Sequence, residues 1–349
     1  MIRSQAICKM LRPRHVFRIS RGAKPFVENV FLALEQNGHI GYGEGSPNAY
    51  YGESAEQAHG LLLSLSDWLR RQTIEGPESI ADLWHRSWEH LAPSRTAQCA
   101  LDLALWDLAA KRSQVTVAEL ALGRPAMPVA SSVTLGLEEK EEQIRQLESM
   151  RAFHRYKLKL DGEPDFDHIR FLIRKAPGLW AWDANGAWDT ACLGKYEAQM
   201  QALSPTLLEQ PFSPANDGIL RSWKPHCPAP LYADESCRNL EDLPGLAAKY
   251  HGVNLKLVKA GGLTPALAMQ KKAAELGLQC MVGCMLESSL LISAGLVLAQ
   301  NAGWADLDGA WLLQHDPFPG LTWKEGYLHP SPKPGFGVLP EDRLPDFTR

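Results

Sequence analysis

The chain has 349 residues, of which 45% are hydrophobic and 22% are charged. This is the composition of a folded globular protein, which excludes a disordered chain, and the length suits two domains or one large barrel with an addition. The 36 lysines and arginines against 40 aspartates and glutamates give a net charge of −4, so nothing in the charge balance points to a nucleic-acid or membrane partner.

The N-terminal part of the chain predicts a small α+β domain over residues 1–115. Residues 27–35 alternate apolar and polar side chains, Asn37 and Gly38 form a two-residue hairpin signal, and residues 39–45 return as a second strand. Residues 54–69, 79–91 and 94–111 then show helical periodicity. Strands followed by helices favour an α+β fold. The glycines at 41, 43 and 45 lack the spacing and helix context of a dinucleotide-binding loop.

From about residue 128 short apolar runs alternate with helical stretches. Eight runs are expected as strands: residues 129–135, 156–160, 179–184, 207–210, 231–234, 252–257, 279–284 and 305–308. A polar residue stands at or just after the end of each run, and these residues follow one another at intervals of 22 to 28. A period near 25 fits a strand, a helix and two loops, so residues 116–319 predict a TIM-type barrel. The proline-rich tail, 320–349, is expected to pack on the N-terminal domain.

No segment resembles a membrane span or a disulfide framework. The longest nearly apolar run, residues 290–299, is far shorter than the ~20 residues that cross a bilayer. The basic first fourteen residues have no apolar core behind them, so we expect no signal peptide. The seven cysteines are an odd number without a CxxC pair, which favours reduced thiols. These features predict a cytoplasmic protein.

Successive strand ends carry lysines and acids. Lys157 and Lys159 are two apart on one strand, so their side chains face the same way. The next three strands end in acids, and the one after them ends in a lysine: Asp183, Glu209, Asp234 and Lys256. Three carboxylates at one barrel mouth repel each other unless a cation lies between them, and Mg²⁺ prefers oxygen ligands. The set therefore predicts a magnesium site with a lysine on each side.

Each of these residues alone has an ordinary explanation. A single acid at a strand end is usually a helix N-cap or a solvated residue, and Lys157 alone would be a surface charge. Their order on five successive strands, at nearly one period, is what favours a joint site.

The segments around these residues resemble the enolase superfamily. They are residues 157–159, 183–185, 208–211, 233–236 and 254–262, together with the helix at 101–111. The resemblance is to the muconate-lactonizing-enzyme subgroup. It implies an α/β fold in which a modified TIM barrel, (β/α)7β, carries an N-terminal α+β capping domain, and it implies a homo-oligomer.

The resemblance also implies a shared half-reaction, removal of a proton next to a carboxylate to give an enediolate whose charge a divalent metal stabilises. One Mg²⁺ per subunit would be held by the three acids. Lys159 and Lys256 would be the acid–base pair, and Lys157 would support the substrate carboxylate. A lysine is a base only when neutral, and the metal and the Lys157 ammonium would both lower its pKa. The same pair also suits elimination or ring closure.

The last predicted strand favours one of the reactions that this pair of lysines could catalyse. Asp306 and Asp308 resemble the signature of dipeptide epimerases, in which two acids meet the substrate's α-ammonium group. Residues 283–289, which include Met285, resemble the same group. The implied activity is Mg²⁺-dependent epimerisation of a dipeptide by 1,1-proton transfer at the α-carbon next to the C-terminal carboxylate. The other explanation of the two acids is an N-cap beside an exposed acid.

Two polar loops, residues 20–24 and 46–52, are expected as lids over the mouth. Arg21 or Lys24 could meet an acidic substrate side chain, as in L-Ala-D/L-Glu, and Tyr50 or Tyr51 could pack on an apolar one. Each could equally be an ordinary surface group, so the side-chain preference stays open. Thr134, on the first strand, could also touch the substrate.

Three alternatives stay open. The first keeps the superfamily but changes the reaction, to an N-acylamino acid racemase, an o-succinylbenzoate synthase or a muconate cycloisomerase; the paired Asp306 and Asp308 count against it, since two buried acids would weaken binding of a substrate without an amine. The second is a Schiff-base aldolase, because a lysine on a barrel strand also suits imine chemistry. The third is a barrel without catalytic activity.

Overall fold

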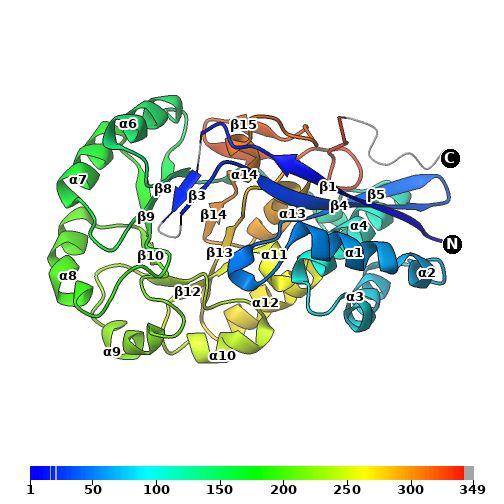
Figure 1. Ribbon diagram of the computed structural model, residues 1–349, viewed down its shortest axis with the longest axis horizontal. Coiled ribbons are helices and arrows are strands. Elements are labelled where there is room, and N and C mark those ends of the chain that lie inside the picture. Colours follow the sequence, from blue (N-terminus) through cyan, green and yellow to red (C-terminus); the bar gives the residue numbers. More distant parts are fainter. Residues whose placement is uncertain (16, 20–21, 342–349) are drawn as a thin grey trace.

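The computed structural model describes residues 1–15, 17–19 and 22–341 of the chain. Figure 1 shows two parts side by side: an N-terminal sheet with its helices, in blue and cyan, and a barrel whose colours run from green to orange. The predicted combination of a capping α+β part and an eight-stranded barrel is confirmed.

The capping sheet has three antiparallel strands in the order β1-β4-β5, with bounds Arg3–Leu11, Val27–Gln36 and His39–Gly45. The predicted hairpin between the last two is confirmed, and Asn37 and Gly38 both have positive φ, 54° and 81°, as its two-residue turn requires. The sequence does not predict β1, nor the small hairpin of β2 (Phe17–Ile19) and β3 (Gly22–Lys24).

Five helices follow the sheet and the short turn η1 (Ala49–Tyr51): α1 (Ala55–Ser64), α2 (Ser66–Leu69), α3 (Pro77–Leu91), α4 (Arg95–Arg112) and α5 (Val117–Leu122). Of these, α1, α2 and α4 contact the sheet, and α3 and α5 pack on α4. The predicted helical stretch over 54–69 is confirmed, except that it is divided at Leu65, whose φ and ψ are −75° and −11°, into α1 and α2. The predicted helix over 94–111 is confirmed as α4, which is buried from Thr96 to Ala110.

The three alternate glycines of β5 let the sheet lie directly on α4. A Cβ at Gly43 would come within 1.9 Å of the Ala100 carbonyl oxygen, and Cβ atoms at Gly41 and Gly45 would each come within 2.4 Å of an α4 carbonyl oxygen. No side chain fits in that space. The spacing of these glycines is therefore explained by packing.

Replacing Gly43 with alanine is expected to lower the free energy of unfolding by at least about 3 kcal/mol, since the new methyl group would overlap backbone that cannot move away. Gly60 is the matched control, because it lies in α1 with nothing within 4 Å of its Cβ position. There alanine should stabilise the protein by about 1 kcal/mol. Urea unfolding of both variants tests this, and equal effects at the two positions would contradict it.

The barrel has eight parallel strands in sequence order: β7 (Val133–Leu135), β8 (Arg155–Lys159), β9 (Leu179–Asp183), β10 (Leu207–Glu209), β11 (Leu231–Ala233), β12 (Gly252–Leu255), β13 (Gln279–Gly283) and β14 (Trp304–Asp306). A bridge between Ser131 and Ala305 brings the first and last strands together, and the Ser132 amide donates to the Ala305 carbonyl at 2.9 Å. The sheet is thus nearly closed.

Helices connect the strands on the outside of the barrel: α6 (Lys140–Ser149), α7 (Phe166–Lys175), α8 (Cys192–Leu203), α9 (Leu220–Trp223), α10 (Leu243–Leu246), α11 (Leu257–Ala260), α12 (Leu263–Glu275) and α13 (Ser289–Ala299), with short turns η2 (Asp217–Ile219) and η3 (Leu240–Asp242). After β14 the described part of the chain has one further helix, α14 (Gly309–Leu312). Seven crossovers and a final strand give the (β/α)7β form that the sequence implies.

The segment expected as the first barrel strand, 129–135, is two strands. The second is β7; the first, β6 (Val129–Ala130), pairs instead with a hairpin of the tail, β15 (Thr322–Lys324) and β16 (Tyr327–His329). Further on, the Phe336 amide donates to Asp107 Oδ1 on α4 at 2.8 Å. The tail therefore contacts both the barrel and the capping part.

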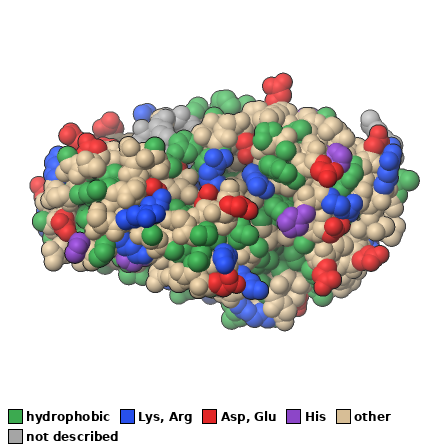
Figure 2. All heavy atoms as spheres, turned by 90° about the horizontal axis from the view of Figure 1, so that it is seen from below, with side chains coloured by type: hydrophobic (Ala, Val, Ile, Leu, Met, Phe, Trp, Pro, Cys, Tyr) green, Lys and Arg blue, Asp and Glu red, His purple; other side chains and the backbone are tan. Residues whose placement is uncertain are grey.

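The surface carries charges of both signs (Figure 2), and the cysteines form no disulfide, as the near-neutral composition and the cysteine pattern predict. Figure 2 shows one face of the molecule, on which side chains of both charges are interspersed. All seven cysteines are free. Among the described residues no helix is long and apolar enough to cross a membrane.

Candidate active site

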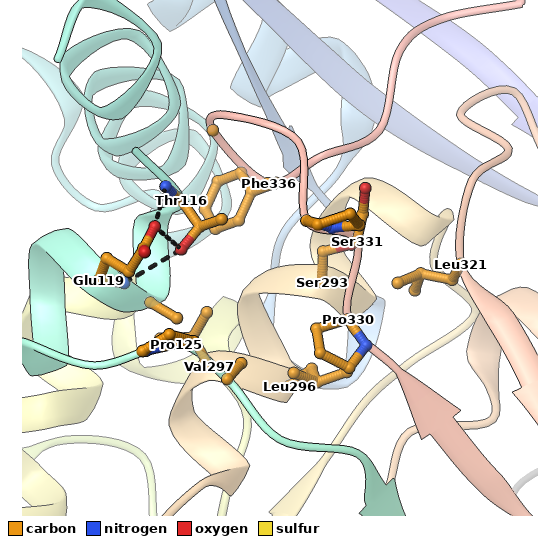
Figure 3. Close-up of a pocket in the computed structure, with 14 residues that line it drawn as sticks. Thr116, Glu119, Pro125, Ser293, Leu296, Val297, Leu321, Pro330, Ser331 and Phe336 are labelled. Atoms are coloured by element: carbon orange, nitrogen blue, oxygen red, sulfur yellow. Dashed lines mark hydrogen bonds between the residues drawn. The ribbon is translucent and has the colours of Figure 1, made fainter. Parts of the chain in front are cut away.

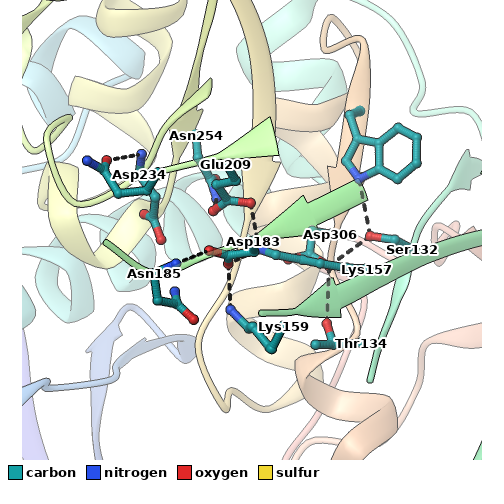
Figure 4. A network of polar contacts seen from close by, with 12 residues as sticks. Ser132, Thr134, Lys157, Lys159, Asp183, Asn185, Glu209, Asp234, Asn254 and Asp306 are labelled. Atoms are coloured by element: carbon teal, nitrogen blue, oxygen red, sulfur yellow. Dashed lines mark hydrogen bonds and ion pairs between the residues drawn. The ribbon is translucent and has the colours of Figure 1, made fainter. Parts of the chain in front are cut away.

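Figure 4 shows the two lysines of β8 beside the three predicted acids at one mouth of the barrel. Lys256 lines the same cavity as these lysines. Lys159 ends β8 and lies in register with Asp183, which ends β9 and is in turn in register with Glu209. Asp234 and Lys256 come directly after β11 and β12. Because all eight strands are parallel, these carboxyl ends face the same side.

The acids Asp183, Glu209 and Asp234 form one buried cluster. Each offers an oxygen, and these oxygens lie within 4.8 Å of one another. Burial would raise the pKa of Asp183, but Lys159 and Lys157 outweigh it and hold that pKa below its usual range. Burial and the Asp183 charge raise the pKa of Glu209 to about 7. Three buried carboxylates at this separation match the oxygen ligand set of a hard divalent cation.

Lys157 lies at the centre of this charge cluster and is fully buried. Its Nζ is 3.0 Å from Asp183 Oδ2, 2.8 Å from Glu209 Oε2 and 2.9 Å from Asp306 Oδ2. Burial would lower the pKa of Lys157, but Asp306, Glu209 and Asp183 outweigh it and raise that pKa well above its usual value. Lys157 is therefore a fixed positive charge at the floor of the mouth.

The other two lysines reach the cavity wall. Lys159 Nζ lies 2.6 Å from Asp183 Oδ2, and Lys256 Nζ lies 2.8 Å from Asp234 Oδ2. β8 and β12 are four strands apart in a barrel of eight. The two ammonium groups thus approach the mouth from opposite sides.

The sequence analysis missed Lys259, which is as buried as the lysines of the mouth. Its Nζ donates to Asp234 Oδ1 and to the Asp234 carbonyl, both at 2.6 Å, and to the Asn254 carbonyl at 3.1 Å. Asp234 is thereby held between Lys256 and Lys259. The sequence could have indicated Lys259, because it follows Lys256 by three residues and so lies about one helical turn further on.

Asp306 and Asp308 both face the cavity, although the last strand does not continue between them. β14 ends at Asp306, and Asp308 stands before α14 without capping it. Asp306 Oδ1 instead accepts from Ser132 Oγ at 2.8 Å, and Asp308 Oδ2 accepts from the Thr134 amide at 2.7 Å. Burial and the Asp306 charge raise the pKa of Asp308 to about 7. The N-cap explanation of this pair is therefore wrong for Asp308.

A cavity of about 100 Å³ opens over these groups and is lined by both parts of the protein. The barrel contributes Thr134, Lys157, Lys159, Asp234, Lys256, Met285, Asp306 and Asp308; the capping part contributes Val27, Ser46, Pro47, Asn48 and Tyr51. Of the expected lid residues, Tyr51 lines the cavity and Tyr50 is exposed. Arg21 lies outside the described residues, and Lys24 is placed only as part of β3.

A second cavity, of about 330 Å³, lies away from the barrel mouth between α5, α13 and the tail (Figure 3). Glu119 is the charged side chain in the described lining, and it accepts from the backbone and hydroxyl of Thr116 at 2.8 Å in a helix-capping arrangement. The titratable groups suited to catalysis therefore gather at the barrel mouth.

Two family models match the chain, the mandelate racemase/muconate lactonizing enzyme N-terminal domain over residues 2–123 and an enolase C-terminal-domain-like model over residues 139–344. A hydrophobic dipeptide epimerase of a Flavobacteria bacterium is 34% identical over 342 residues, covering 94% of this chain and 95% of that protein. The L-Ala-D/L-Glu epimerase of Escherichia coli is 33% identical over 321 residues, covering 91% of this chain and 96% of that protein.

Solved structures of similar proteins point to the same family. A dipeptide epimerase from Methylococcus capsulatus, complexed with Mg and L-Arg-D-Lys, has a TM-score of 0.90 and 29% identity, covering 97% of this chain and 99% of its own. An enolase family member from Agrobacterium tumefaciens, with bound sodium and L-Ala-L-Glu, has a TM-score of 0.87 and 31% identity, covering 95% and 98%. Both domains of the fold match over most of the chain, so this protein belongs to the mandelate racemase/muconate lactonizing enzyme family of the enolase superfamily.

Proposed function

We propose that the protein is a Mg²⁺-dependent dipeptide epimerase that inverts the α-carbon next to the C-terminal carboxylate. The observation that carries this proposal is one cavity with two lysines on opposite walls and two acids, Asp306 and Asp308, on a third. Relatives named as epimerases of dipeptides, at 34% and 33% identity, support it.

The substrate carboxylate would lie over Lys157 and the three acids. Mg²⁺ held by Asp183, Glu209 and Asp234 would supply positive charge where negative charge develops on that carboxylate. The Lys157 ammonium, fixed by its buried acid partners, adds a permanent charge from the same side. The carboxylate end of the dipeptide is thus oriented before the proton moves.

Lys159 and Lys256 would move the proton. An α-carbon between them presents one face to Lys159 and the other to Lys256, since β8 and β12 lie across the barrel from each other. The neutral lysine on one side takes the α-proton at its Nζ, and the ammonium of the lysine on the other side delivers a different proton to the opposite face. The bond from carbon to hydrogen breaks on one face and forms on the other, so the configuration inverts.

Asp306 and Asp308 would bind the α-ammonium group of the N-terminal residue, a charge-assisted contact. This contact argues against a different function in the same superfamily, that of an N-acylamino acid racemase. A relative of that class, an N-acetyl-D-glutamate racemase of Pseudoalteromonas, is also 33% identical over 303 residues. Asp306 already pairs with Lys157, but an acylated nitrogen carries no charge to offset the buried Asp308 carboxyl, so the paired acids favour a free amino group.

The first experiment is a mass-spectrometric screen of L,L-dipeptides in D₂O with the enzyme and Mg²⁺. Dipeptide substrates should gain one deuterium with no other mass change, and the gain should disappear in EDTA. Borohydride should not trap a substrate on the protein, whereas the aldolase alternative requires such an adduct. No exchange in the whole library would refute the proposed function.

Replacing Asp308 with asparagine is expected to lower kcat/KM for dipeptides about 10- to 100-fold, because the amide keeps the acceptor for Thr134 but loses the charge that attracts the ammonium group. N-acetylated dipeptides serve as inhibitors for comparison, and their Ki should change less than threefold, or about 0.6 kcal/mol. Asp161→Asn, at an exposed acid after β8, is the control variant. An equal loss of affinity for free and acetylated dipeptides would show that Asp308 has only a structural role.

We further propose a cytoplasmic location and a homo-oligomeric state. The seven free cysteines support a reducing compartment, and the oligomer is implied by the family resemblance alone. Light scattering after size-exclusion chromatography tests the second point, and a monomer at micromolar concentration would refute it.

A further inference from the structure

The barrel residues that overhang the mouth are fastened to the capping part. We call residues 285–288, between β13 and α13, the roof segment. Its Leu286 carbonyl accepts from Asn29 Nδ2 at 3.0 Å and from Ser46 Oγ at 3.3 Å. Asn48 Nδ2 lies 3.8 Å from Met285 Sδ. The roof segment and the loop after β5 therefore form one continuous wall of the cavity.

Glu44, near the end of β5, is the centre of these contacts and is fully buried. Its Oε2 accepts from Ser288 Oγ at 2.5 Å, and its Oε1 accepts from the Ser288 amide at 3.1 Å and from Asn29 Nδ2 at 2.7 Å. The same Asn29 amide group reaches the Leu286 carbonyl. One carboxyl thus fixes the roof segment at two points, directly at Ser288 and through Asn29 at Leu286.

Ser289, the residue after Ser288, is also held by a carboxyl, but through contacts that lie away from the mouth. Ser289 Oγ donates to Asp316 Oδ2 at 2.5 Å, and the Ser289 amide lies 3.2 Å from Asp316 Oδ1. Asp316 also accepts from the Phe318 amide at 2.9 Å, and Phe318 packs on the capping rings of Phe31 and Tyr42. Two adjacent serines at the start of α13 are therefore held by two carboxyls, one connected to the cavity wall and one not.

We propose that Glu44 is a positioning residue for substrate binding: it holds Met285 and Leu286 against Ser46 and Asn48, so that the capping part sets the shape of the cavity wall in the barrel. This rests on the proposed function. Met285 and Leu286 both line the cavity of about 100 Å³, so a displacement of the roof segment changes the fit of the dipeptide. Lys159 and Lys256 are held by ion pairs with Asp183 and Asp234, which lie outside the roof segment, so kcat should change less than KM.

The test compares Glu44→Ala with Asp316→Ala. Both variants lose a carboxyl that binds one serine amide and hydroxyl, so both should lower the melting temperature. Glu44→Ala should raise KM for dipeptides at least tenfold with kcat within threefold of the wild type. Asp316→Ala should leave KM within twofold. Glu44→Gln, which keeps one acceptor oxygen, should fall between the alanine variant and the wild type.

A second readout does not depend on epimerase activity. In protein with ¹³C-methyl-labelled methionine, the Met285 signal, assigned with Met285→Leu, should shift or broaden in Glu44→Ala and stay in place in Asp316→Ala. If no dipeptide is a substrate, the proposed function fails while this measurement still tests the link. Equal KM changes in the two variants, or an unmoved Met285 signal in Glu44→Ala, would overturn the inference. Ser288→Ala, which removes only the hydroxyl, provides the same comparison if Glu44→Ala does not fold.

Discussion

A Lys159→Met variant is expected to epimerise dipeptides at least about 10³-fold more slowly than the wild type, because a positioned acid or base contributes about 10²- to 10⁴-fold and epimerisation needs one on each face. The same loss is expected for Lys256→Met. Proton exchange distinguishes the two variants. In D₂O, each should still exchange the α-proton of one epimer only, the one whose proton faces the remaining lysine, and the two variants should act on opposite epimers.

Proton NMR of each purified epimer in D₂O measures this, and Lys272→Met, at an exposed lysine of α12, should behave as the wild type. The complementary pattern follows from the positions of β8 and β12 across the barrel. Loss of exchange for both epimers in one variant, with normal exchange in the other, would show that a single lysine acts on both faces.

Removal of divalent metal is expected to abolish activity, and Mg²⁺ should restore it. Glu209→Gln should weaken metal binding about 100-fold or more, since even outer partners of metal sites contribute about 10- to 100-fold to affinity. Mg²⁺ should also raise the melting temperature of the wild type, because it binds the folded acid cluster and not the unfolded chain. Electron paramagnetic resonance of added Mn²⁺ gives the dissociation constant.

The control for this experiment is Asp217→Asn. Asp217 is also a buried acid, but it lies outside the mouth and pairs with Lys249 at 2.6 Å. Its loss should lower stability without changing the metal dissociation constant. Activity that persists through exhaustive chelation, or equal effects of the two variants on Mn²⁺ binding, would contradict a metal site at Asp183, Glu209 and Asp234.

The barrel could be predicted because its strands are buried on both faces and end at polar residues, which gives a periodic signal. The strand β1 gives no such signal: its side chains alternate irregularly between exposed and buried positions, since one sheet face is partly solvated. The pairing of β6 with β16 joins residues almost 200 apart, and no local pattern reports a distant partner.

The residues of the site also fall into those that the sequence predicts and those that it does not. The residues at strand ends, from Lys157 to Asp308, could be found because parallel strands bring their ends together. Glu44 could not, because its partners Ser288 and Asn29 lie on the barrel and on another strand. A buried acid such as Glu44 needs hydrogen-bond partners, but the residues around it in the sequence do not show which segment provides them.

The tail has a consequence for how the protein is made. Asp107 of α4 bonds to an amide 229 residues later in the chain, at Phe336, and the Gly335 carbonyl accepts from Val117 at 2.9 Å. During synthesis α4 therefore lacks these partners until the chain has been made as far as Phe336. Contacts of such long sequence separation slow folding. Truncation of the tail removes them, so it should leave the N-terminal part more exposed to proteases.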